Sequence, residues 1–211
     1  MHGFDLPGAV CGFLGMHLAL RSESADLVRL VADGGQPVLV RRRTELLTRV
    51  LHAHHTAEDR LLWPSLERRQ PGFEPTTTLL EDQHRRLDEM LAALKRDPGT
   101  VGEVRSLLEE HLVAEETRAL PVWLASFTAE EHDAFGRRLR ASTPLREIGV
   151  LIPWLLDASP DETVGMAWEH LPKPMRGAYR LWWKRAYERR WGRVPSRLDD
   201  HLVTGVHLAA A

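Results

Sequence analysis

The chain has 211 residues, of which 43% are hydrophobic and 27% are charged, and its formal net charge is −2. This balance is typical of a globular protein in water and excludes a disordered chain or one built mainly of membrane spans. The near-neutral charge gives no general field for nucleic acid or for an anionic membrane, so we expect neither as a partner. The single cysteine, Cys11, excludes an internal disulfide, and residues 1–15 lack the pattern of a signal peptide. We therefore expect a cytoplasmic protein.

Helical periodicity dominates the sequence, and no alternating strand pattern is found, which predicts an all-α fold. The first helix is expected over about residues 10–31, ending at the Asp33–Gly35 turn. The second is expected over residues 37–69. Because Pro64 lacks a backbone donor, we expect a kink or a short break just after Trp63.

Two further long helices follow turns that are rich in proline and glycine. Residues 76–78 are threonines that offer caps for a third helix reaching about Arg96. A fourth helix is expected after the Asp97–Gly99 turn and reaches about Leu120. Four helices joined by short turns pack most simply as an antiparallel four-helix bundle, whose interior can assemble metal ligands from facing helices.

Shorter, tryptophan-rich helices are predicted in the rest of the chain. They span residues 129–140, 144–156, 161–169 and 174–191. We expect their aromatic side chains to pack on the bundle or on a second subunit, in a monomer or a homodimer. The basic and aromatic residues 176–193 favour an amphipathic packing helix over a nucleic-acid site. The predicted organisation is a bundle of residues 1–127, a helical extension of residues 128–193 packed on it, and a loosely ordered tail of residues 194–211.

One pattern occurs twice and carries the predicted chemistry. His54 is followed four residues later by Glu58, and His111 is followed four residues later by Glu115. Residues four apart lie on one face of a helix, so each pair can present an imidazole and a carboxylate to the same point inside a bundle. A single such pair is a weak signal, because His and Glu are common on solvated faces.

The first and third predicted helices each add one histidine, His17 and His84. Every helix of the bundle then contributes a nitrogen donor, and this distribution predicts a metal site. Nitrogen and carboxylate ligands without thiolate suit iron, manganese or zinc, and a carboxylate-rich pair of sites favours iron, with manganese or zinc as less favoured alternatives.

The segments MHLALR, HAHHTAEDRLLWPSL, EDQHRRLDEML and EEHLVAEETRALPVWL resemble the hemerythrin family, in particular its bacterial HHE cation-binding branch, over about residues 10–127. The resemblance implies a non-heme centre of two iron ions inside a four-helix bundle, bridged by two carboxylates and by an oxo or hydroxo group. It further implies that His17, His54, His84 and His111 are terminal ligands and that Glu58 and Glu115 are bridges.

The chain departs from oxygen-carrying hemerythrins on the third helix, where Asp88 stands in place of a fifth histidine four residues after His84. Some HHE proteins place an extra ligand directly after the second-helix histidine, and His55 stands there. Whether His55 is a ligand or a neighbour of the ligands is left open by the sequence. His52 lies off the favoured face of its helix and is not expected to bind metal.

Other polar residues near the motifs are expected to have supporting roles. Asp59 and Glu116 each follow a bridging glutamate and are expected to point away or to hold a neighbouring histidine. Arg21 and Glu81 are interpreted as members of helix-surface pairs. No role is assigned to the remaining histidines, which are His2, His132, His170, His201 and His207.

Three functions remain open. The resemblance implies a protein that binds or senses O2 or NO, or reacts with peroxide, in a pocket expected to be walled by Leu62, Trp63 and Trp123. A di-iron oxidase or peroxidase acting on an organic substrate would use the same ligands. The third possibility is iron storage or an iron-dependent interaction with a partner.

Overall fold

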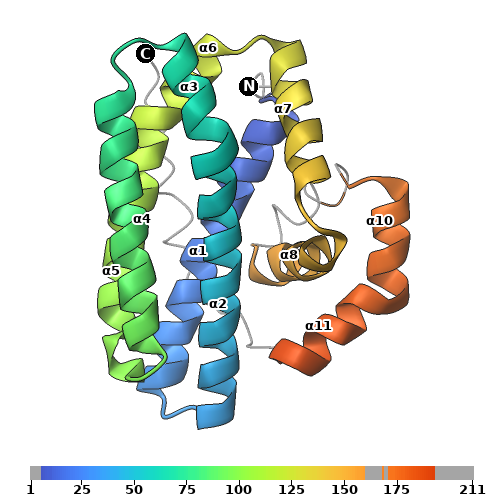
Figure 1. Ribbon diagram of the computed structural model, residues 1–211. Coiled ribbons are helices and arrows are strands. Elements are labelled where there is room, and N and C mark those ends of the chain that lie inside the picture. The colour runs from blue at the N-terminus through green and yellow to red at the C-terminus, as the bar shows by residue number, and fades with distance from the viewer. Residues whose placement is uncertain (1–5, 160–167, 169–170, 193–211) are drawn as a thin grey trace, which may run out of the picture.

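The computed structural model describes residues 6–159, 168 and 171–192. These residues form helices and turns without any strand, so the predicted all-α fold is confirmed (Figure 1). No helix within the described ranges is long and apolar enough to span a membrane.

Four long helices form an antiparallel bundle (Figure 1). They are α1 (Gly8–Ala32), α2 (Pro37–Ala57), α4 (Glu74–Leu94) and α5 (Val101–Ala114). Each helix packs against the next along the chain, and α5 returns to pack against α1. The first turn requires glycine twice, because Gly34 has a φ of 67° and a Cβ atom at Gly35 would lie 2.6 Å from the carbonyl oxygen of Leu30.

The caps predicted at residues 76–78 are wrong. Helix α4 already begins at Glu74, so the three threonines lie inside its first turns, and no side chain caps its start. Pro75 lies in the first turn, where the missing backbone donor has no partner to lose. The proline, rather than a threonine hydroxyl, therefore marks the start of this helix.

Two of the bundle helices continue through short π-helical segments. Helix α2 passes into η1 (Glu58–Leu62) and then α3 (Trp63–Arg69), while α5 passes into η3 (Glu115–Ala119) and then α6 (Leu120–Ser126). The N–H of Trp63 donates to the carbonyl of Glu58, five residues back. Of the kink or short break predicted just after Trp63, the break is wrong, because the wider turn before Pro64 accommodates the proline and the helix continues through it.

The bundle core is divided into two apolar regions. The first region contains Leu20, Leu47, Leu51, Leu87, Leu91 and Leu108, and the second contains Val10, Phe13, Trp63, Leu80, Ala119 and Trp123. Along each of the four helices, the histidines and glutamates of the predicted site lie at or near the boundary between these two regions. A polar layer therefore crosses the bundle between two apolar ends.

The C-terminal helices lie along one side of the bundle (Figure 1). They are α7 (Ala129–Ser142), α8 (Leu145–Ala158), α10 (Lys173–Ala178), the π segment η4 (Tyr179–Trp183) and α11 (Lys184–Trp191). Helices α7 and α8 pack against α1, and α11 packs against α2. The helix predicted at 161–169 and the tail predicted at 194–211 lie outside the described residues, apart from Trp168.

A buried ion pair joins these outer helices to the bundle. Arg43 on α2 donates to both carboxylate oxygens of Glu23 on α1, and both side chains are almost fully buried. The indole of Trp154 on α8 also donates to Glu23, at 3.2 Å. On its other side, Arg43 donates to the hydroxyl of Tyr187 on α11 at 3.3 Å, and that hydroxyl donates to Asp157 at 3.0 Å. One arginine thus connects α1, α2, α8 and α11.

We predict that Arg43→Met lowers the free energy of unfolding by about 3–5 kcal/mol, because it leaves the Glu23 carboxylate buried without its cation. The matched control is Arg49→Met on the same helix. Arg49 pairs with Glu147 of α8 at 2.9 Å, but it is 38% exposed, so its loss should cost less than about 1 kcal/mol. Urea unfolding measures both values, and equal costs would contradict the role given to Arg43.

Candidate metal centre

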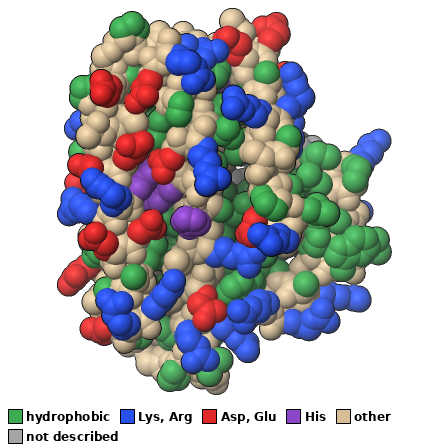
Figure 2. Space-filling view, in the orientation of Figure 1, with side chains coloured by type: hydrophobic (Ala, Val, Ile, Leu, Met, Phe, Trp, Pro, Cys, Tyr) green, Lys and Arg blue, Asp and Glu red, His purple; other side chains and the backbone are tan. Residues whose placement is uncertain are grey.

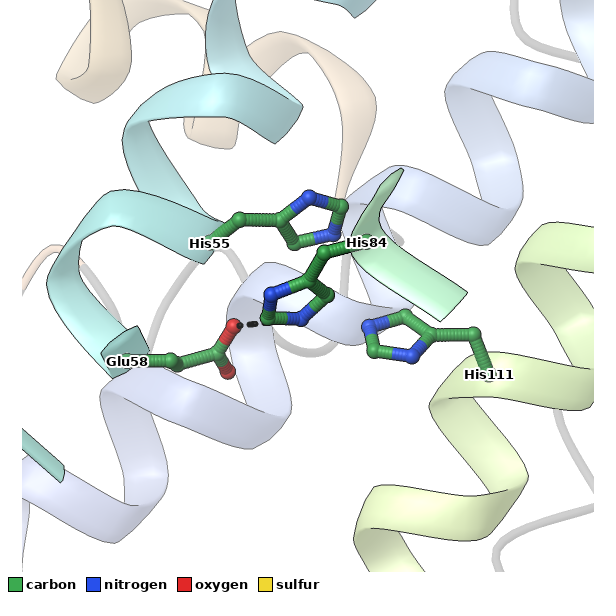
Figure 3. Close-up of side chains that lie close together, drawn as sticks. All are labelled: His55, Glu58, His84 and His111. Carbon is green, nitrogen blue, oxygen red and sulfur yellow. Dashed lines mark ion pairs between the residues drawn. The ribbon is translucent and has the colours of Figure 1, made fainter. Parts of the chain in front are cut away.

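Seven side chains from the four helices converge in the polar layer between the two apolar regions. They are His17, His54, His55, Glu58, His84, His111 and Glu115, and none is more than 7% exposed. These are the residues that the sequence analysis selected. Figure 3 shows four of them: the Glu58 carboxylate lies beside the ring of His84, and the rings of His55 and His111 lie next to that ring.

The donor atoms fall into two groups, each compact enough to surround one ion. Within each group, one candidate ligand atom per residue lies within 4.8 Å of all the others. The first group is His55, Glu58, His84 and His111, and the second is His17, His54, Glu58 and Glu115. Glu58 belongs to both groups, as a carboxylate shared by two ions would.

The two oxygens of Glu115 face opposite groups. Its Oε1 lies 3.2 Å from Nε2 of His111 and 3.8 Å from Nε2 of His84. Its Oε2 lies 3.2 Å from Nε2 of His17 and 3.9 Å from Nε2 of His54. The carboxylate therefore reaches both positions, one oxygen to each.

Glu58 repeats this arrangement from the opposite helix of the bundle. Its Oε1 lies 3.2 Å from Nε2 of His54, and its Oε2 lies 3.7 Å from Nε2 of His84. Both glutamates stand at the first residue of a π-helical segment. Each carboxylate therefore stands at the point where its α-helix passes into a π-helical turn.

The inward-facing atoms of this layer lack hydrogen-bond partners. The unpartnered buried atoms include both oxygens of Glu58 and Glu115, both ring nitrogens of His55, and Nε2 of His17, His54, His84 and His111. Burying so many polar atoms without partners is costly, and native proteins seldom do so. Bound cations would satisfy most of them together, including one nitrogen of each ring, so the residues present fit a metal centre.

The outward nitrogens of three of these histidines are held by side chains. Nδ1 of His17 lies 2.8 Å from Glu116, and Nδ1 of His84 lies 2.9 Å from Asp59. Nδ1 of His111 lies 3.2 Å from the amide oxygen of Gln83. Since a carboxylate or amide oxygen accepts, each Nδ1 carries the proton and leaves Nε2 with a lone pair for a metal.

Of the two roles predicted for Asp59 and Glu116, the geometry shows the second, because each holds the ring of a neighbouring histidine. The sequence analysis did not select Gln83, which stands directly before His84 and is buried. Its position next to His84 in the sequence could have indicated this role, because a buried amide beside one ligand can support a ligand from the facing helix.

The charges of the layer are in conflict when no cation is present. Burial and the nearby Glu115 raise the pKa of the Glu58 carboxyl well above its usual value. Burial also opposes ionisation of Glu115, but His111, His17 and His84 outweigh it and hold the pKa of Glu115 well below its usual value. The two carboxylates therefore do not carry equal charge until a cation stabilises both.

The histidines differ in the same way. Burial lowers the pKa of His54 and His55 well below the usual value, which keeps both rings neutral. Burial acts in the same direction on His84, but the hydrogen bond to Asp59 and the nearby Glu115 carboxylate outweigh it and raise the pKa of His84 to about 9. A metal ion at this position would replace that proton.

Aromatic side chains border the centre on one side. The ring of Phe13 lies 4.0 Å from that of His17, 5.8 Å from that of His54 and 5.6 Å from that of Trp123. Leu62, Trp63 and Trp123, the expected wall residues, belong to the same buried cluster. Phe13 was not selected from the sequence, although it lies one helical turn before His17.

Several residues lie outside the centre. Asp88 and His52 are exposed, as is Glu81. His132 is buried, with its ring 5.5 Å from that of Trp123. It belongs to neither group of candidate ligands. His2, His170, His201 and His207 lie outside the described residues.

The helix-surface role predicted for Arg21 is incomplete. Arg21 does pair with exposed Glu109, at 3.0 Å, but it also donates to both oxygens of Glu116, at 2.7 and 3.2 Å. Burial opposes ionisation of Glu116, but His17 and Arg21 outweigh it and lower the pKa of that carboxyl. Spacing along one helix did not reveal this contact, because Glu116 comes from a different one.

Residues 13–125, more than half of the chain, match the family model described as the hemerythrin HHE cation-binding domain. The chain belongs to this family. The resemblance noted in the sequence motifs is thereby confirmed, and the buried layer of histidines and glutamates fits the metal binding that defines the domain. No solved structure shows a significant match.

The curated relatives of this hemerythrin-like chain include plant zinc finger proteins of Arabidopsis thaliana. The zinc finger protein BRUTUS is 26% identical over 172 residues, covering 73% of this chain and 14% of its own length. Two BRUTUS-like zinc finger proteins are 24% and 22% identical, each covering 68% of this chain and 13% of its own length. The chain thus spans about one seventh of the length of these relatives.

We predict that divalent metal stabilises the protein and that a chelator removes this gain. At a free metal concentration about 100 times the dissociation constant, the gain should be about 2.7 kcal/mol, because metal binds the folded layer and not the unfolded chain. Melting temperatures with Co²⁺ and with a chelator measure it. His111→Ala should lose most of the shift and exposed His52→Ala should keep it, whereas a melting temperature indifferent to metal would contradict the assignment.

Proposed function

We propose that this domain holds a pair of iron ions and uses them to bind or sense a small diatomic molecule, O2 or NO, or to react with peroxide. The observation that carries the proposal is the division of each carboxylate between two groups of histidines. A carboxylate with one oxygen toward each of two nitrogen-rich positions is the arrangement expected of a bridge between two ions. Nitrogen and oxygen donors without sulfur favour iron over structural zinc.

The proposed ligands divide unequally between the two positions. His55, His84 and His111 would hold one ion, His17 and His54 would hold the other, and Glu58 and Glu115 would bridge them. His55 is included because both of its ring nitrogens are buried without partners. Its ring also stacks on that of His84, with centroids 3.8 Å apart, so it lies beside another proposed ligand of the same ion.

The position with two histidines is the one proposed to receive the small ligand. Paired ferrous ions, when bound, would supply an open coordination position and exchangeable electrons. The surrounding side chains would exclude water from this position. Phe13 contacts the ring of His17, and it belongs to the same buried apolar cluster as Trp63 and Trp123. The geometry therefore favours a small apolar ligand over a bulky polar substrate.

Two wider features belong to the same proposal. All seven proposed ligands lie within residues 1–127, so this part of the chain would form the functional bundle, and residues 128–193 would form an extension packed on it. We also propose a cytoplasmic location, supported by the single cysteine and by a ligand set that suits ferrous iron.

Iron analysis and anaerobic spectroscopy test the function directly. Protein loaded with Fe²⁺ without oxygen should contain two irons per chain. It should then change its absorption reversibly when O2 or NO is added and removed. One iron per chain would remove the paired centre, and two irons without any spectral response to these ligands would remove the sensing role.

We predict that Glu58→Ala and Glu115→Ala each lose at least one iron per chain, because one bridge is missing and several buried histidines lose their shared ion. Glu110→Ala is the matched control, since Glu110 lies on α5 beside His111 but is exposed. It should keep the wild-type iron content by elemental analysis. Full iron content in both bridge variants would show that the carboxylates are not bridges.

A further inference from the structure

The ring of His17 is held at the end of a charged chain that runs inward from the protein surface. We propose that Arg21 is a positioning residue, which fixes the Glu116 carboxylate and through it aims Nε2 of His17 at the metal. This inference rests on the proposed function, because it assigns a role toward that centre. It gives Arg21 a part that neither the family match nor the ligand motifs assign.

The contacts of the Arg21 guanidinium carry the argument. Its Nη1 and Nη2 donate to the two oxygens of Glu116, at 2.7 and 3.2 Å, and its Nε donates to Glu109, at 3.0 Å. A planar guanidinium bound to both carboxylate oxygens fixes the plane of that carboxylate as well as its position. The Glu116 oxygen that faces His17 is therefore held in one orientation.

The next contact transmits this direction to the ring. Oε1 of Glu116 accepts from Nδ1 of His17 at 2.8 Å, and Nε2 on the far side of the ring lies 3.2 Å from Oε2 of Glu115. The ring is thus oriented from outside the centre. Without Arg21, the Glu116 carboxylate could turn toward solvent, and the imidazole would lose the contact that sets its rotation.

Exposure falls steadily along this chain of contacts. The side chains of Glu109, Arg21, Glu116 and His17 are 53%, 21%, 14% and 0% exposed. The residues come from α5, α1 and η3, so the chain also ties three parts of the bundle together beside one metal position. An ion pair that is mostly shielded from water is screened less than an exposed pair, so its attraction holds the two side chains together more strongly.

The other supported histidines have no comparable device. His84 is held by Asp59, which is 40% exposed and pairs with no arginine or lysine among the described residues. His111 is held by the neutral amide of Gln83. Within the part of the chain that the structure describes, only His17 is therefore supported by a carboxylate that an arginine holds in place. A change at Arg21 should lower the metal affinity of the position that includes His17 and leave the other position unchanged.

Titration with Co²⁺ tests the selectivity. Wild type should bind two ions, and Arg21→Met should weaken one of the two by about 10- to 100-fold while leaving the other unchanged. Asp59→Asn is the comparison for the opposite position, because it should weaken the other ion. Equal weakening of both ions by Arg21→Met, or no weakening, would overturn the inference.

Proton NMR of the Co²⁺-loaded protein supplies a readout that a general loss of stability would not move. The Nδ1 protons of His17, His84 and His111 should give shifted signals that exchange with water. In Arg21→Met, the His17 signal alone should disappear or its proton should exchange faster. Arg21→Lys keeps the charge but not the two-oxygen contact, so partial recovery is expected. An unchanged His17 signal in Arg21→Met would overturn the positioning role.

The outcome for wild type separates this inference from the function on which it rests. Wild-type protein that binds no metal would defeat both. Two bound ions, with Arg21→Met identical to wild type, would defeat the positioning role and leave the paired centre intact. Glu109→Gln, which keeps the Arg21–Glu116 contact, should retain both affinities, and its failure to do so would place the effect at the surface pair instead.

Discussion

The structure depends most on the electrostatic repulsion between two carboxylates that are buried close together. Glu58 and Glu115 face one another across the bundle axis, surrounded by imidazoles and shielded from water. Unpaired charges in such a setting are expensive, and hydrogen bonds alone do not satisfy them here. Because bound cations would remove the conflict, the layer that is most costly without metal would be the one that binding stabilises most.

The rest of the fold supports that layer from outside. Apolar side chains fill the bundle above and below it, while Glu116, Asp59 and Gln83 hold the histidines from behind. The second buried charge pair, Glu23 with Arg43, lies on α1 and α2, which also carry three of the candidate ligands. The outer helices therefore attach to the same two helices that position those ligands. Figure 2 shows the basic and apolar side chains of the outer helices beside the bundle.

Spacing within a helix predicted the bundle and the pairs His54–Glu58 and His111–Glu115. The distribution of histidines over the helices added His17 and His84, and the family resemblance added His55 as an open candidate. Pairs such as His54 and Glu58 share a face wherever the helix lies. Contacts between helices were less accessible, so Arg21 was assigned to the surface and Gln83 was passed over. The effect of Pro64 was also misjudged, since a proline reports that a hydrogen bond is missing and not how the backbone compensates. Phe13 shows the same limit, because an aromatic residue in a helix has many possible neighbours.

The two π-helical segments have a consequence for how such a centre can be constructed. A π turn amounts to one extra residue inserted into an α-helix. Glu58 and Glu115 themselves keep ordinary helical spacing from His54 and His111, so removing one residue from η1 and one from η3 would instead rotate every following side chain by about 100° relative to these pairs. The extra residue in each helix thus allows a histidine–glutamate pair and the tryptophan beyond it, Trp63 on α3 or Trp123 on α6, to face the same bundle core.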